Sequence, residues 1–211
     1  MARRFWAGIT LAACTLFVSS IPANAQEFVA KLSGFQEVGG LNAETGAILS
    51  QGEGTLKLTL DKNAQSISYT LTYSFPTTTT VQQSHIHFGK EHVPGNIIVY
   101  FCTNLTPPPA PATVPPPCPT SAGTVTGTIT GPDVTAKAAA QNIPAGDFAA
   151  LVSAITSDTA YANVHTVSFP AGEIRGQIHR VRRRPFPFHP GKPGGDDNSG
   201  NGGGDGGEHN H

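Results

Sequence analysis

Charged side chains are scarce in this 211-residue chain: aspartate, glutamate, lysine and arginine make up 13% of it, and the formal net charge is −1. This balance argues against a broad basic surface of the kind that binds nucleic acid. Methionine and tryptophan occur once each, and long runs with helical periodicity are rare, which argues against a large α/β nucleotide-binding enzyme. Glycine (24) and proline (18) are abundant instead. The chain is therefore rich in turns between short elements, and its length suits one domain.

Apolar runs long enough to span a bilayer are also missing. Residues 1–25 have the pattern of an export signal: two arginines near the start, a mostly apolar stretch over 5–18, and a small-x-small cleavage pattern at 23–25. Residues 11–14 (Leu-Ala-Ala-Cys) offer an alternative, a lipoprotein processing box, but the apolar run continues past them, which favours ordinary cleavage. We expect a secreted or periplasmic mature chain without a transmembrane segment.

Cysteine is scarce as well, and the expected mature chain keeps only Cys102 and Cys118. Outside the cytoplasm such a pair predicts one disulfide. Seven prolines lie between the two residues, so the loop should be extended and solvated. A redox role would favour a Cys-x-x-Cys spacing, which is absent. The predicted bond is a structural staple, which stabilises by about 3 kcal/mol in the chain-entropy model.

The C-terminal residues 182–211 have the composition of a disordered tail. They open with three arginines, pass through several prolines, and end in a stretch over 191–211 that contains nine glycines. Such a stretch cannot offset the entropy of ordering by burying apolar side chains. We expect a solvated Pro/Gly-rich tail that follows a folded body over 26–181.

The body shows period-two alternation of apolar and polar residues in several segments, as in Leu56, Leu58 and Leu60 with polar residues between them. The expected strands cover 28–32, 55–60, 66–73, 81–88, 96–101, 122–130, 159–166 and 173–181. Residues 148–155 break this pattern, because their apolar positions recur at helical spacing after Gly146-Asp147. These observations predict an all-β fold, a Greek-key antiparallel sandwich or flattened barrel of about eight strands with one short helix in a connection.

His85 and His87 stand two residues apart on one expected strand, so their side chains share a face and lie roughly 6.5–7 Å apart along it. The apolar Ile86 and Phe88 claim the opposite, inward face, so both imidazoles should face outward. Neutral imidazole is a good ligand for Cu or Zn. Two histidines do not make a site, and a polar strand face without a ligand is the alternative.

A second segment supplies a third imidazole. His165 shares a strand face with Tyr161 and Asn163, while Ala162 and Val164 occupy the other face. A short turn then leads to the next expected strand, which places Arg175 near His165 on the outer face of a hairpin. An ion pair between Arg175 and Glu173 is the plainer alternative for that arginine, and His92 and His179 are expected to be surface histidines.

These residues resemble a known family. The segments 85–89 (His-Ile-His-Phe-Gly), 95–99, 161–166 and 172–178 (Gly-Glu-Ile-Arg-Gly-Gln-Ile) are similar to the CHRD domain, a module named after chordin that also occurs in secreted bacterial proteins. The resemblance covers about 27–180. It implies an extracellular β-rich module, whose bacterial members have no well-established activity, and it makes the proline loop an insertion between family strands.

A more distant similarity is to copper–zinc superoxide dismutase, which implies a superoxide-dismutase-like sandwich, an immunoglobulin-like one being the other option. His85 and His87 would match the first copper ligands, His165 a later ligand, and Arg175 an arginine that guides anions to copper. Gly89 stands one residue closer to the histidine pair than in that family. The zinc subsite and the disulfide pattern have no counterpart, so the resemblance implies at most a copper-only or vestigial site.

Two functions follow as expectations. The first is a non-catalytic extracytoplasmic module that binds a partner protein, a matrix component or a metal, because the sequence offers no nucleophile–base pair, close carboxylate pair or cofactor loop. The alternative is a copper-dependent oxidoreductase that resembles superoxide dismutase. His85, His87 and His165 are expected to converge on a site able to hold Cu or Zn with an open position, and Arg175 would attract anions to it. The alternative for this cluster is that the three histidines hydrogen-bond loop carbonyls and brace the sandwich without a metal.

Overall fold

The computed structural model describes residues 25–38, 46–108 and 113–182. The predicted export signal and the predicted tail therefore lie outside the described residues, apart from Ala25 and Arg182. The described strands are β1 (Gln26–Ser33), β2 (Glu53–Asp61), β3 (Ser66–Ser74), β4 (Val81–Phe88), β5 (Asn96–Thr103), β6 (Ala122–Ile129), β7 (Ala160–Thr166), β8 (Ile174–Gln177) and β9 (His179–Arg180). The helices are the 3-10 turns η1 (Gly34–Gln36), η2 (Gly131–Asp133) and η3 (Ala136–Gln141), and the α-helix α1 (Phe148–Thr156).

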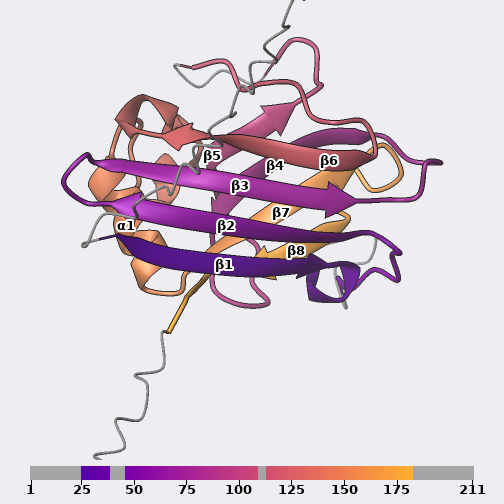
Figure 1. The fold of residues 1–211 in the computed structure, drawn as a ribbon, viewed down its shortest axis with the longest axis horizontal. Helices are drawn as coiled ribbons and strands as arrows, with labels where there is room; N and C mark the ends of the chain where they lie inside the picture. Colours follow the sequence, from indigo (N-terminus) through magenta and orange to yellow (C-terminus); the bar gives the residue numbers. More distant parts are fainter. Residues whose placement is uncertain (1–24, 39–45, 109–112, 183–211) are drawn as a thin grey trace, which may run out of the picture. The chain divides into compact units, whose positions relative to one another are not determined.

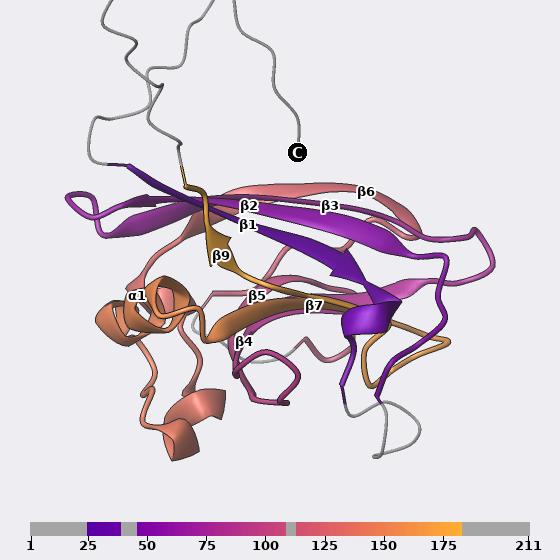
Figure 2. The ribbon, with the colours of Figure 1, turned by 90° about the horizontal axis from the view of Figure 1, so that it is seen from below.

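The strands form one antiparallel sheet that folds over into two layers. Its order is β5-β4-β7-β8-β1-β2-β3-β6, with β9 paired to β1. Figure 1 shows β1, β2, β3 and β6 side by side, with β4, β5 and β7 crossing behind them, and Figure 2 shows the two layers edge-on. The connections from β3 to β4 and from β5 to β6 each run from one layer to the other, as they do in a Greek key. The all-β sandwich predicted from the alternation is confirmed.

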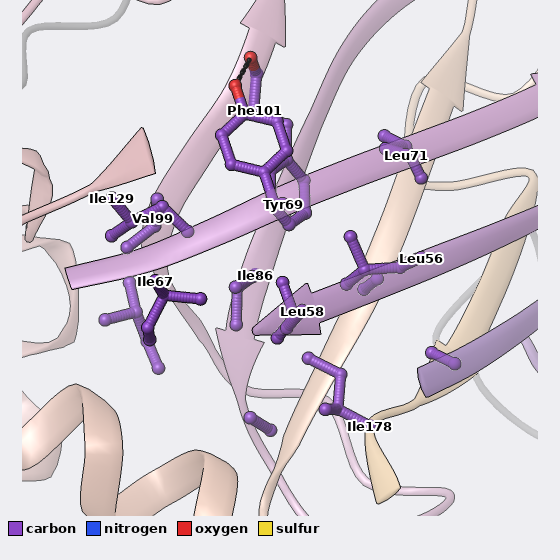
Figure 3. Close-up of a cluster of buried hydrophobic side chains, with 14 of the residues drawn as sticks. Leu56, Leu58, Ile67, Tyr69, Leu71, Ile86, Val99, Phe101, Ile129 and Ile178 are labelled. Atoms are coloured by element: carbon purple, nitrogen blue, oxygen red, sulfur yellow. Dashed lines mark hydrogen bonds between the residues drawn. The ribbon is translucent and has the colours of Figure 1, made fainter. Parts of the chain in front are cut away.

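Alternating leucines and aromatic residues build the core between the layers. Leu56, Leu58 and Leu60 of β2 are at most 1% exposed, because one face of the strand meets the opposite layer and the other meets solvent. Tyr69 of β3 packs its ring 4.8 Å from that of Phe101 across the layers and donates a hydrogen bond to the Phe101 carbonyl (3.2 Å; Figure 3). The buried hydroxyl thus has a partner.

One expected strand is wrong in its extent. Residues 173–181 do not form a continuous strand: β8 pairs with β7 and, at Arg175, with the end of β1, whereas β9 pairs with β1 alone. Ile178 stands at the break, fully buried, and its N–H donates to the Ala160 carbonyl (2.9 Å). The chain leaves one layer for the other here, so the expected segment contributes two of the nine described strands.

The helix and the disulfide match their predictions. The side chain of Asp147 caps α1 by accepting a hydrogen bond from the Ala150 N–H (2.8 Å). Cys102 at the end of β5 is bonded to Cys118. Within the described ranges, no helix has the length and hydropathy of a membrane span.

The core predicts a clear contrast between neighbours on β2. Leu56→Ala should lower the free energy of unfolding by about 2–5 kcal/mol, because it leaves a cavity between the layers. Lys57→Ala, whose side chain is exposed, should change it by no more than about 0.5 kcal/mol. Chemical denaturation followed by circular dichroism measures both, and equal losses for the two variants would contradict the packing described.

Candidate metal centre

The sheet face opposite the core carries the histidines that the sequence singled out. Ile86 on β4 and Val164 on β7 are fully buried in the core. Because side chains alternate along a strand, His85, His87 and His165 point to the other face. The side-chain parity predicted from the sequence is confirmed.

Strand pairing then brings the three rings together. In the antiparallel pair of β4 with β7, Gln83 lies opposite His165 and His85 lies opposite Asn163. His165 is therefore the diagonal neighbour of His85 on the same face, within reach of a large side chain. The ring centre of His85 lies 4.5 Å from the ring centre of His87 and 4.5 Å from that of His165, so His85 occupies the middle of the group.

The three imidazoles form a compact cluster. One ring nitrogen from each histidine lies within 4.8 Å of the other two, so a point between them is closer than that to all three. Among the described residues, no cysteine, aspartate or glutamate joins this group. His85, His87 and His165 are the three residues whose convergence the sequence predicted.

The outer face of this sheet is not open to solvent, which corrects the expectation that the imidazoles face outward. His85 is 0% exposed and His165 is 7% exposed, whereas His87 is partly exposed, with its Nε2 buried. The parity was right, but the loops that follow β4 and β7 fold back over the face: the covering loop, residues 89–95, contacts His87, and the turn at Pro170 contacts His165. Alternation alone cannot reveal such cover.

Two backbone carbonyls orient two of the rings. Nδ1 of His87 donates to the Gly95 carbonyl (2.7 Å), and Nδ1 of His165 donates to the Pro170 carbonyl (2.9 Å). A carbonyl can only accept, so each neutral ring carries its proton on Nδ1 and a lone pair on Nε2. Metal-binding histidines are oriented in this way by a hydrogen bond from their second nitrogen.

The remaining nitrogens of the cluster have no partner. Both ring nitrogens of His85, Nε2 of His87 and Nε2 of His165 are buried and make no hydrogen bond. Leaving one buried polar atom unpaired costs about 1–3 kcal/mol, and most such atoms in proteins are satisfied. A neutral imidazole keeps one proton, so His85 contributes one N–H and one lone pair, and the cluster holds three lone pairs without a partner. Three lone pairs in a single cluster call for a ligand that accepts them.

Burial also keeps the imidazoles uncharged. Loss of hydration lowers the pKa of His87 to about 3 and lowers the pKa of His165; it lowers the pKa of His85 well below its usual value, and the neighbouring imidazoles act in the same direction. At neutral pH all three rings are therefore neutral, which is the form that binds metal ions.

Tyr161 and Gly95 fix the position of His87 further. The Tyr161 ring stacks on the His87 ring, with centres 4.6 Å apart and planes 4° apart. The Gly95 N–H donates to the Tyr161 hydroxyl (3.1 Å), while the Gly95 carbonyl accepts from His87. Gly95 thus holds both rings of the stack. A Cβ at this residue would lie 1.7 Å from the Phe88 carbonyl oxygen, so only glycine fits.

Arg175 of β8 holds the covering loop in place. Its guanidinium carbon lies 3.8 Å from the centre of the Tyr161 ring, a cation–π contact. Its Nη2 donates to the carbonyls of Lys90 (2.9 Å) and Val93 (3.3 Å), and Nη1 donates to the Gln36 carbonyl (3.4 Å). One side chain therefore ties two loops to the sheet next to the histidines.

Comparison with known proteins identifies the family. The family model of the CHRD domain matches residues 28–178. The chain belongs to the CHRD family. No curated protein and no solved structure matches the chain, so the resemblance to superoxide dismutase stays a prediction.

Within this CHRD domain, Arg175 lies only in part as the sequence suggested. It points to the face opposite the core, as predicted, and packs on Tyr161 there, but it is 2% exposed, so the expectation that it faces solvent is wrong, and an anion-guiding role stays a prediction. Glu173 does not pair with it either: the Glu173 carboxylate accepts hydrogen bonds from the hydroxyls of Ser50 and Thr166. The strand alternation could not show that loop carbonyls take up the guanidinium.

Sequence reasoning missed three other contributors to the CHRD site. Gly95 and Pro170 act through backbone carbonyls, for which a sequence has no signal beyond the glycine in the 95–99 motif. Glu37 follows η1, is 4% exposed, and accepts a hydrogen bond from the Asn163 amide. Burial raises the pKa of Glu37 to about 7. His92 and His179 are exposed, as predicted, and lie beside Glu91 and Asp158.

The buried imidazoles predict that the metal-free domain is labile to acid. Their folded-state pKa values lie below the unfolded value of 6.5, so the unfolded chain binds more protons as the pH falls below 6.5. Each histidine then removes up to about 1.4 kcal/mol of unfolding free energy per pH unit. Glu37, with its raised pKa, increases the unfolding free energy as the pH falls from about 7 to 4.5. It is a single group, so the three histidines outweigh it.

Denaturation of the chelator-treated protein at pH 7, 6, 5 and 4 measures this slope. His85→Phe should flatten it, Glu37→Gln should steepen it, and the exposed-site control His92→Ala should leave it unchanged. An unfolding free energy in the unaltered protein that does not fall below pH 6.5 would contradict burial of neutral rings.

Gly95 provides a test of the covering loop. Gly95→Ala should lower the free energy of unfolding by about 1–3 kcal/mol, because the added methyl group meets backbone and forces the loop to shift. Gly131→Ala is the matched control, since its Cβ would meet nothing closer than the Gly146 carbonyl at 3.1 Å. If denaturation midpoints of the two variants agree, the loop does not pack as described.

Proposed function

We propose that this protein is an extracytoplasmic binding module whose CHRD domain holds a Cu or Zn ion through His85, His87 and His165. The observation that carries the proposal is the set of four buried, unpaired imidazole nitrogens in one cluster. Two of the rings are already oriented by carbonyls, and all three are neutral at pH 7. Imidazole nitrogens of this kind suit Cu and Zn.

The proposed location outside the cytoplasm rests on three observations. CHRD modules are extracellular, the chain carries the disulfide between Cys102 and Cys118, and residues 1–25 have the pattern of an export signal. Disulfides persist in oxidising compartments and are rare in the cytosol. A secreted or periplasmic site of action accounts for all three.

Binding without catalysis is the form of the proposal that the contacts support. The unpaired nitrogens are enclosed, and the guanidinium of Arg175 is engaged by the carbonyls of Lys90 and Val93. A dismutase-like mechanism would use Arg175 to draw an anion toward an open metal position, and these contacts give that alternative no support.

Metal titration tests the proposal. The purified protein is stripped with a chelator and titrated with Zn²⁺ and with Cu²⁺ by isothermal calorimetry, and the retained metal is counted by elemental analysis after gel filtration. We expect one ion per chain. His85→Ala and His165→Ala should each lose that ion, because a third of the ligand set is gone.

A control protein carries His209→Ser and His211→Ser, so that histidines near the C-terminus cannot supply the metal-binding signal. His92→Ala serves as the matched single-histidine control. A further variant combines His85→Ala, His87→Ala and His165→Ala. Retention of the ion in that variant would refute the proposed site, as would no uptake of either ion by the unaltered protein.

A further inference from the structure

The ligand set of the cluster is small and uncharged. Among the described residues, the three imidazoles are the potential ligands that meet there, with no carboxylate or thiolate beside them. Zn²⁺ takes four ligands in structural sites, and with three protein ligands it keeps a water molecule or a substrate at the fourth position. Cu(I) has a filled d shell and forms stable complexes with two or three neutral nitrogen ligands. Three imidazoles alone therefore complete the coordination of Cu(I) but not that of Zn²⁺.

The surroundings leave little access for a fourth ligand from solvent. Every unpaired nitrogen of the cluster exposes less than 1 Å². The Tyr100 ring meets His85 edge-on at 5.4 Å, and the Tyr161 ring stacks on His87. Aromatic rings and loop backbone thus enclose the cluster, so an ion there is held by protein nitrogens.

Charge points the same way. The guanidinium carbon of Arg175 lies 3.8 Å from the centre of the Tyr161 ring, which stacks on the ring of His87, so a positive charge stands near the cluster. The carboxyl group of Glu37 accepts from the Asn163 amide, and among the described residues no carboxylate joins the three imidazoles to offset an added charge. The cost of burying an ion rises with the square of its charge, so a monovalent ion is favoured over a divalent one.

We infer that the centre formed by His85, His87 and His165 is a Cu(I) site, selective for monovalent copper over Zn²⁺ and Cu²⁺. The inference rests on the proposed function and names its ion. Three neutral nitrogens, an enclosed position and neighbouring positive charge each favour Cu(I), and together they favour no divalent ion.

Competition with chromophoric chelators tests the inference. Under anaerobic conditions, acetonitrile-stabilised Cu(I) is titrated into the chelator-treated full chain against bathocuproine disulfonate, and Zn²⁺ against a zinc-responsive dye. We expect one Cu(I) per chain, bound at least about a hundredfold more tightly than Zn²⁺. X-ray absorption of the copper-loaded, unaltered protein should show three nitrogen ligands at about 2.0 Å. This second measurement needs no variant to fold.

His85→Ala and His87→Ala should lose the tight Cu(I) component, and His179→Ala, which removes an exposed histidine, should keep it. Binding of Zn²⁺ or Cu²⁺ as tight as that of Cu(I) would overturn the inference and leave the proposed metal site standing. A four-coordinate spectrum, or one with sulfur ligands, would also overturn it. Failure of all three ions to bind in a cluster-dependent manner would overturn both.

Discussion

The hydrogen bonds from Nδ1 of His87 to the Gly95 carbonyl and from Nδ1 of His165 to the Pro170 carbonyl decide which nitrogens face the middle of the cluster. They place the proton of each ring at the loop and the lone pair at the neighbouring rings. This arrangement works only while the rings are neutral, since a second proton on each would bring positive charges together in a buried space. The rest of the face serves that condition by excluding water.

The loops that exclude water are themselves held by few side chains. Arg175 donates to three loop carbonyls and rests against the Tyr161 ring, and Tyr161 in turn stacks on His87. A planar guanidinium with five donors can satisfy several carbonyls at once, which lysine cannot do. Arg175 therefore links the second sheet face to its cover in the way that leucines link the two layers across the core.

This organisation explains how a CHRD domain can be a sandwich with two different interiors. Between the layers lies an apolar core of leucine, isoleucine and aromatic side chains. On the far side of β4, β7 and β8 lies a smaller polar interior, covered by loops. Stability in the first comes from apolar burial, whereas the second buries polar groups at a cost and needs partners for each. Among the described residues, five buried side-chain nitrogens lack a partner: four belong to the histidine cluster, and the fifth is Nε of Arg175.

The amino-acid sequence by itself determined the strands, the helix start at Asp147, the pairing of Cys102 with Cys118, and the face of His85 and His165, because these follow from alternation, spacing and composition. Tertiary structure alone decided that this face is covered, that Arg175 is taken up by loop carbonyls, and that the last expected strand divides at Ile178. The physical reason is that alternation reports which side of a strand a residue occupies, whereas burial on that side depends on how loops fold back over it. The carbonyls of Gly95 and Pro170 are near in sequence to the histidines that they hold, and those of Lys90 and Gln36 are far from Arg175. Every residue has the same backbone carbonyl, so the sequence does not mark which one is used.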